Sequence, residues 1–211
     1  MQNLKNIAVG FLVSFIGSIP LGYLNVIGFD IYEKQGFNAT VFYLLGVICI
    51  EFWVIFLTLV FANKLVKKEK LLKFIEAFSV IFMFVLACVF YSSGNSGDDN
   101  RTVFYNVGHN FYFSGILYSC LNFIQIPFWL SWNLYLLNGK YIEISNARKY
   151  LYVFGTVAGT FVGMLVLILS LHYFARNVEF LSKYLMQFII PLVFIGLGIF
   201  NGIKFFRKYY G

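Results

Sequence analysis

Charged residues are scarce in this sequence. Only 12% of its 211 residues are Asp, Glu, Lys or Arg, whereas 60% are hydrophobic. A soluble globular domain usually carries about 25% charged residues. A chain with so little charge has too little polar surface to face water on every side. The composition therefore argues against an ordinary soluble domain and favours a protein that lies in a membrane.

Cysteine, histidine and recognisable catalytic motifs are also few. Cys49, Cys88 and Cys120 all lie in apolar segments, away from both histidines. This pattern indicates neither a disulfide framework nor a metal site, and we expect no cofactor. The sequence has no H-E-x-x-H motif, no paired intramembrane aspartates and no glycine-rich phosphate loop, so we do not expect an enzyme.

Long apolar runs are what the sequence has in their place. A helix needs about 20 apolar residues to cross a bilayer, and the runs do not alternate as the strands of a membrane barrel would. We therefore predict an all-α polytopic membrane protein with six transmembrane helices in one domain, residues 1–211, with an external loop at 92–110. The six runs are Ile7–Phe29, Ala39–Ala62, Leu71–Tyr91, Phe111–Leu137, Tyr150–Phe174 and Tyr184–Phe206.

Basic residues are unevenly divided between the two sides of this six-span arrangement. The side with both termini carries 12 Lys and Arg residues, and the other side carries the remaining 4, Lys34, Arg101, Arg176 and Lys183. Because cytoplasmic loops hold the positive excess, we predict cytoplasmic termini in a multi-pass protein of the inner membrane. The charge of +7 then reflects topology and attraction to the lipid bilayer, and we expect no nucleic-acid partner.

The two halves of the chain resemble each other. Pro20 corresponds to Pro127 at a spacing of 107, the segment ending at Gly46 corresponds to the one ending at Gly155 at 109, and Lys73 corresponds to Lys183 at 110. The alternative is chance similarity between apolar helices. Since each half has three spans, the second half would enter the membrane from the opposite side. The spacing thus predicts two inverted three-helix repeats, about 1–91 and 111–211, as in many secondary transporters.

Polar side chains accompany a proline in the first and fourth runs. In the first run, Ser14, Ser18, Gly22 and Asn25 share one helical face beside Pro20; in the fourth, Ser119, Asn122, Gln125 and Trp129 share one beside Pro127. A proline within a span breaks the helix. Broken helices at corresponding positions of two repeats indicate a transport site, although tolerated kinks with interhelical hydrogen bonds are the alternative.

Glu51 is the only acidic residue deep within a predicted span. A charged side chain at that depth costs roughly 2.5–3.5 kcal/mol on insertion scales. We expect its carboxyl group to be protonated, hydrogen-bonded or exposed to water, and to face the space between helices one and four with Asn25 and Asn122. A coupling-ion or substrate site is one interpretation, and a structural hydrogen bond to a neighbouring helix is the other.

Small residues recur every fourth position in two later runs. Gly155, Gly159 and Gly163 form one such series, and Gly198 and Gly202 form another. Small residues at this spacing let two helix backbones approach closely. The series favour helix packing, either within the chain or at the seam of a homodimer.

Several of these segments resemble the lysine exporter superfamily, the LysE and RhtB type of small bacterial efflux proteins. Pro20-Leu21-Gly22-Tyr23 is similar to the family's P-x-G-P motif, with Tyr23 in place of the second proline. The segment from Gly46 to Glu51 resembles the family's glycine followed by an acidic residue. Asn122-Phe123 before Phe128-Trp129 is similar to its N-P and F-W pairs without the proline, and Gly196-Leu197-Gly198 matches its G-L-G ending.

The resemblance implies export of amino acids or similar small solutes, driven by the proton gradient. It gives the chain a small-molecule substrate and makes Glu51 and the polar residues around the two prolines candidates to bind the substrate or the coupling ion. The alternative from another functional class is a non-transporting membrane subunit for assembly or interaction. A transporter needs a polar cavity between helices one and four, where such a subunit would have a filled, dry core.

Overall fold

The fold is all-helical in the residues that the computed structural model describes, which are 2–18, 22–65, 69–95, 110–145, 147–177 and 188–210. No strand occurs within these ranges. The helices are α1 (Gln2–Ser18), α2 (Tyr23–Val60), α3 (Ala62–Leu65), α4 (Glu69–Asn95), α5 (Phe111–Leu121), α6 (Gln125–Asn138), α7 (Arg148–Asn177) and α9 (Ile190–Tyr209).

Two of these helices are long and apolar enough to cross a membrane. They are α2 and the part of α7 from Arg148 to Phe174, with mean hydropathies of 2.4 and 2.1. The pair α5 and α6 makes a third span if its two members are counted together. The chain is therefore an all-helical protein with two or three long apolar helices, which is compatible with a place in a membrane.

The first and fourth apolar runs are each interrupted rather than continuous. The first ends as α1 at Ser18 and resumes as α2 at Tyr23, and α2 then bends at Gly36, where φ is 80°. A positive φ of this kind favours glycine, because a side chain would be strained there. In the fourth run, α5 and α6 meet at an angle of 72°. The runs Ile7–Phe29 and Phe111–Leu137 were predicted as spans broken at a proline, and in the structure each consists of two helices.

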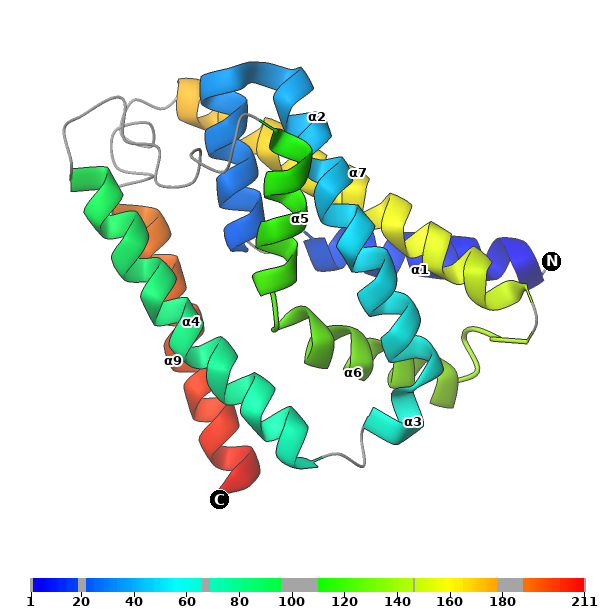
Figure 1. The fold of residues 1–211 in the computed structure, drawn as a ribbon. Helices are drawn as coiled ribbons and strands as arrows, with labels where there is room; N and C mark the ends of the chain where they lie inside the picture. Colours follow the sequence, from blue (N-terminus) through cyan, green and yellow to red (C-terminus); the bar gives the residue numbers. More distant parts are fainter. Residues whose placement is uncertain are drawn as a thin grey trace.

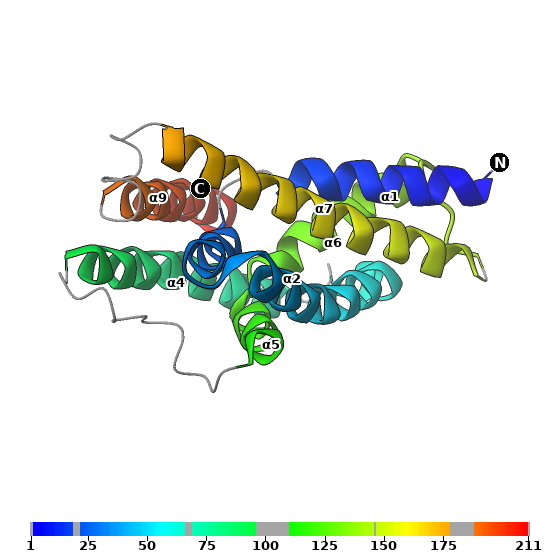
Figure 2. The same ribbon diagram turned by 90° about the horizontal axis from the view of Figure 1, so that it is seen from above.

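Helices that are distant in sequence pack in pairs, and glycines set how closely they approach. Helix α1 lies along α7, the part of α2 after its bend lies against α5, and α4 lies against α9 (Figures 1 and 2). A Cβ atom on Gly155 or Gly159 would come within 2.4 Å of a backbone oxygen of α1. The glycine series of α7 therefore serves packing within the chain, one of its two predicted uses.

Gly46 and Gly115 make the equivalent contact between α2 and α5. A Cβ atom on either residue would lie 2.1 Å from a backbone oxygen of the other helix. At this distance only glycine fits, because neither backbone has room to move. The two contacts, α1 with α7 and α2 with α5, thus have the same physical basis.

The ends of the helices fall into two groups. Both termini, α3 and the connection from α6 to α7 lie toward the lower and right-hand edges of Figure 1. The bend of α2, the start of α5 and the end of α7 lie at the upper left. Of the basic residues assigned to the cytoplasmic side, Lys64 lies in α3, Arg148 begins α7, and Arg207 and Lys208 lie in the last turn of α9.

Candidate functional site

The Glu51 carboxyl group lies inside the helical assembly, against α6. Its Oε1 accepts a hydrogen bond of 3.2 Å from Nε1 of Trp129, a residue of α6 that is only 2% exposed. Its Oε2 is buried and completes no hydrogen bond with the described residues, although Thr160 of α7 lies beside the carboxyl group. A buried carboxylate oxygen without a donor is costly, so this oxygen is a natural position for a proton.

Four helices contribute to the surroundings of this carboxyl group. The Thr160 hydroxyl is hydrogen-bonded to the Ser14 hydroxyl of α1, and Ser14 and Thr160 are both buried. We call Ser14, Glu51, Trp129 and Thr160 the carboxyl cluster. The cluster joins α1, α2, α6 and α7. A change in the charge of Glu51 would therefore alter the contacts of α1, α6 and α7 together.

Side-chain amides bridge both helix interruptions. Nδ2 of Asn25 donates to the Ser18 carbonyl oxygen at 3.1 Å, and Nε2 of Gln125 donates to the Ser119 carbonyl oxygen at 3.0 Å. Each bond adds a side-chain donor to a carbonyl in the last turn of a half-helix, where helical partners run out; the Ser119 carbonyl also accepts the Asn122 backbone N–H at 3.1 Å. In a membrane such partners are essential. Asn25 and Gln125 therefore hold the two breaks in shape.

A third hydrogen bond connects the two breaks with each other. The Tyr23 hydroxyl donates to the Tyr118 carbonyl oxygen near the end of α5. Tyr23 is the residue that stands where the resembled family motif has its second proline. At this position the chain thus gains a buried cross-link between α2 and α5.

The remaining predicted site residues have different places. Ser18 donates to the Ser14 carbonyl at 2.8 Å, and Gly22 precedes α2, where an added Cβ atom would meet nothing within 4 Å among the described residues. Asn122 ends α5 and makes no contact with Glu51 among the hydrogen bonds of the described residues. It was expected to share a helical face with Trp129, and the break at residues 122–124 removes that relation.

Pro127 differs from the expected mid-helix kink. Pro127 lies in the first turn of α6, where a backbone N–H has no helical acceptor and proline is tolerated. The break comes before it, at residues 122–124, so Pro127 lies in the second half-helix and does not kink a continuous one. Pro20 lies outside the described residues.

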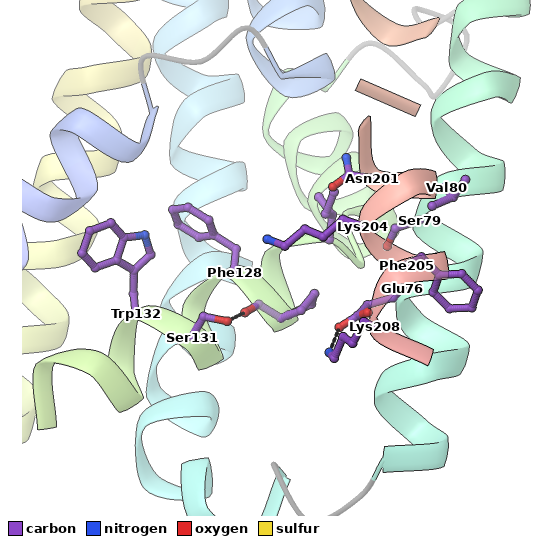
Figure 3. A pocket seen from close by; sticks show the side chains of 12 residues that line it. Glu76, Ser79, Val80, Phe128, Ser131, Trp132, Asn201, Lys204, Phe205 and Lys208 are labelled. Atoms are coloured by element: carbon purple, nitrogen blue, oxygen red, sulfur yellow. Dashed lines mark hydrogen bonds and ion pairs between the residues drawn. The ribbon is translucent and has the colours of Figure 1, made fainter. Parts of the chain in front are cut away.

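A cavity of about 400 Å³ opens between α6 and the α4–α9 pair (Figure 3). Its wall combines aromatic rings, hydroxyl and amide groups, two lysines and one glutamate. The lining residues are Glu76, Ser79, Val80, Ile124, Pro127, Phe128, Ser131, Trp132, Asn201, Lys204, Phe205 and Lys208. A volume of this size lies in the range that small-molecule sites occupy.

The cavity and the carboxyl cluster lie on opposite faces of α6. Phe128, Ser131 and Trp132 face the cavity, whereas Trp129 bonds Glu51 and Asn133 bonds Thr58 and Tyr152. Helix α6 is therefore a partition between the two sites. A displacement of this short half-helix would act on both sites together.

Sequence reasoning did not find Thr160, Lys204 or Ser131 as candidates. Thr160 follows Gly159 in the stripe that packs on α1, which was interpreted only as packing. Lys204 was counted only as a topology charge. Ser131 lies four residues after Pro127, on the same helical face, and this spacing was the one signal that pointed to it.

The function of this site is inferred from its geometry alone, because comparison with known proteins gives no match. No family model, no curated protein and no solved structure matches the chain.

Proposed function

We propose that this protein is a secondary transporter of the inner membrane that exports amino acids or related small solutes in exchange for protons. One observation carries the proposal. Two predicted spans are each broken into two helices, and each break is bridged by a side-chain amide. The carboxyl group of Glu51 lies between them, bonded to Trp129 of α6 and beside Thr160 of α7. Broken helices around an ionisable residue are typical of transport sites.

We also propose the six-span arrangement, with α1 and the first part of α2 as span one and α5 with α6 as span four. The pairing of helices supports an inverted repeat. In such a repeat, α1 corresponds to α5, the part of α2 after its bend corresponds to α7, and α4 corresponds to α9. The α1–α7 contact is then equivalent to the α2–α5 contact, and α4 packs against its own counterpart. Gly46 and Gly155, 109 residues apart, each occupy the close approach of such a pair.

In the proposed mechanism, Glu51 carries the coupling proton. A protonated carboxyl group can remain in the closed cluster, with Oε2 as a donor toward Thr160. An ionised carboxylate is costly in a dry site, so loss of the proton favours a state that admits water. A transporter needs this kind of bias, because a ligand shifts an equilibrium only by its differential affinity for the two states.

The cavity gives the proposed transporter a place for its substrate, although it lies between α6 and the α4–α9 pair and not between the predicted spans one and four. One wall of the cavity is α6, the second half of the broken α5–α6 pair, and the other wall is α4 and α9 (Figure 3). The α4–α9 pair meets the rest of the molecule through aromatic contacts near both breaks, Tyr23 with Phe82 and Phe78 with Phe123. We propose that movement of this pair closes the cavity.

Efflux from cells tests the proposal directly. Cells that express the protein and are loaded with a panel of labelled amino acids should lose at least one of them several-fold faster than cells with an empty vector. A protonophore should abolish this difference. Equal loss of every amino acid from both kinds of cell would contradict the proposal, provided that the protein is present in the membrane fraction.

The proposed topology gives a separate prediction. A reporter fused after Gly211 should be active if it works only in the cytoplasm and inactive if it works only in the periplasm, because the 12 basic residues hold that side inside. A fusion at residue 98, in the predicted external loop, serves as the opposite control. Periplasmic activity of the C-terminal fusion would overturn the six-span arrangement.

A further inference from the structure

We propose that the cavity between α6 and the α4–α9 pair binds the carboxylate of a small solute with an apolar body, and that Lys204 is its cationic partner. The inference rests on the proposed function and names its substrate class. It depends on three properties of the cavity: its charge, its apolar wall and its size.

The charge of the cavity wall is positive. Lys204 and Lys208 lie four residues apart on α9 and both line the cavity. Lys208 is paired with Glu76 at 2.6 Å, whereas Lys204 has no acidic partner among the described residues. Glu69 lines only a neighbouring hollow at the start of α4. One ammonium group in the cavity is thus left for an anion.

The position of Lys204 suits such a partner. Figure 3 shows its side chain extending from α9 toward Phe128 of α6, across the space that the cavity occupies. The Ser131 hydroxyl lies on the opposite wall, where its proton goes to the Pro127 carbonyl at 2.8 Å. The Asn201 amide lies one turn before Lys204 and donates to the Leu197 carbonyl at 2.9 Å. Lys204 is therefore a charged donor of this wall that has no protein acceptor among the described residues.

The rest of the wall suits an apolar body. Phe128, Trp132 and Phe205 contribute aromatic rings, and Val80 and Ile124 contribute aliphatic surface. Sites for small molecules typically combine such surface with a few polar groups that fix the orientation of the ligand. A cavity of about 400 Å³ admits a small carboxylate of the size of an aromatic amino acid.

Equilibrium dialysis with two matched probes tests the inference. The purified full-length protein in phosphatidylcholine nanodiscs is titrated with radiolabelled phenylacetate and with phenylacetamide, its uncharged analogue. We expect phenylacetate to bind about twofold to fivefold more tightly, as a partly exposed ion pair provides. Lys204→Met should remove the difference, Lys204→Arg should keep it, and Arg207→Met, a change on the same helix outside the cavity lining, should leave it unchanged.

Three results would overturn the inference. The first is equal binding of the two probes by the native protein, and the second is a phenylacetate preference that survives Lys204→Met. The third is loss of phenylacetate binding in nanodiscs that contain phosphatidylglycerol, since the cavity would then hold a lipid headgroup. Size-exclusion profiles show whether each variant is folded. If Lys204→Met does not fold, Lys204→Arg still tests the inference.

Binding is measured without any gradient, so its outcome is independent of transport. Lys204-dependent binding in a protein that exports nothing would overturn the proposed function and leave the anion site. Efflux by a protein whose binding ignores Lys204 would overturn only the anion site.

Discussion

Replacement of Glu51 by glutamine should reduce gradient-driven efflux to the level of empty liposomes. Glutamine has the same size, and its Oε1 can still accept the hydrogen bond from Trp129 that Glu51 accepts at 3.2 Å. Only the ability to bind and release a proton is lost. The measurement is efflux of a labelled amino acid from proteoliposomes with an imposed pH difference.

A matched control separates this effect from a general loss of charge. Glu143→Gln changes an exposed glutamate that pairs with Arg148 in the connection between α6 and α7, and it should export like the native protein. Exchange of labelled for unlabelled amino acid, which needs no net proton movement, should persist in Glu51→Gln and lose its dependence on pH. Normal gradient-driven export by Glu51→Gln would make Glu51 a structural residue.

Replacement of Gly159 by alanine should destabilise the folded protein by about 1–3 kcal/mol, as overpacking of a tight contact does. The added Cβ atom would lie 2.3 Å from the Phe11 carbonyl oxygen. Because the obstacle is backbone, α1 and α7 would have to separate. The contact also holds Ser14 near Thr160, so the change should disturb the carboxyl cluster as well. Thermal unfolding in detergent, followed by fluorescence, measures the effect.

Gly196→Ala is the control for this substitution. A Cβ atom on Gly196, in α9, meets nothing within 4 Å. Alanine favours a helix over glycine by roughly 0.5–1 kcal/mol, so this variant should unfold at the same temperature as the native protein or slightly higher. Equal melting temperatures for Gly159→Ala and the native protein would show that the α1–α7 contact does not limit stability.

Local sequence patterns predicted the parts of the fold that depend on composition and spacing. The apolar runs gave the helical class, because an uncharged run of about 20 residues has few alternatives. The four-residue spacing of Gly155, Gly159 and Gly163 correctly indicated a close helix contact. The depth of Glu51 indicated a buried carboxyl group near the predicted fourth span. In the structure this carboxyl group accepts a hydrogen bond from Trp129 of α6.

Properties that depend on which distant helices meet were not predictable in this way. Pro127 suggested a kink at its own position, yet the break falls at residues 122–124 and Pro127 enters the first turn of α6. The break moved Asn122 away from the face of Trp129. The cavity was expected between the predicted spans one and four, whereas the cavity lined by Lys204 lies between α6 and the α4–α9 pair. Helical periodicity identifies which residues share one face of a helix, but it does not identify the helix against which that face packs.

Proton movement during substrate efflux tests the claim of coupled transport most directly. Proteoliposomes are loaded with a pH-sensitive dye and with the amino acid that the cells export best, and are diluted into amino-acid-free buffer of the same pH. The account predicts that efflux acidifies the interior in the native protein and leaves it unchanged in Glu51→Gln. Efflux from the native protein at constant internal pH would contradict it.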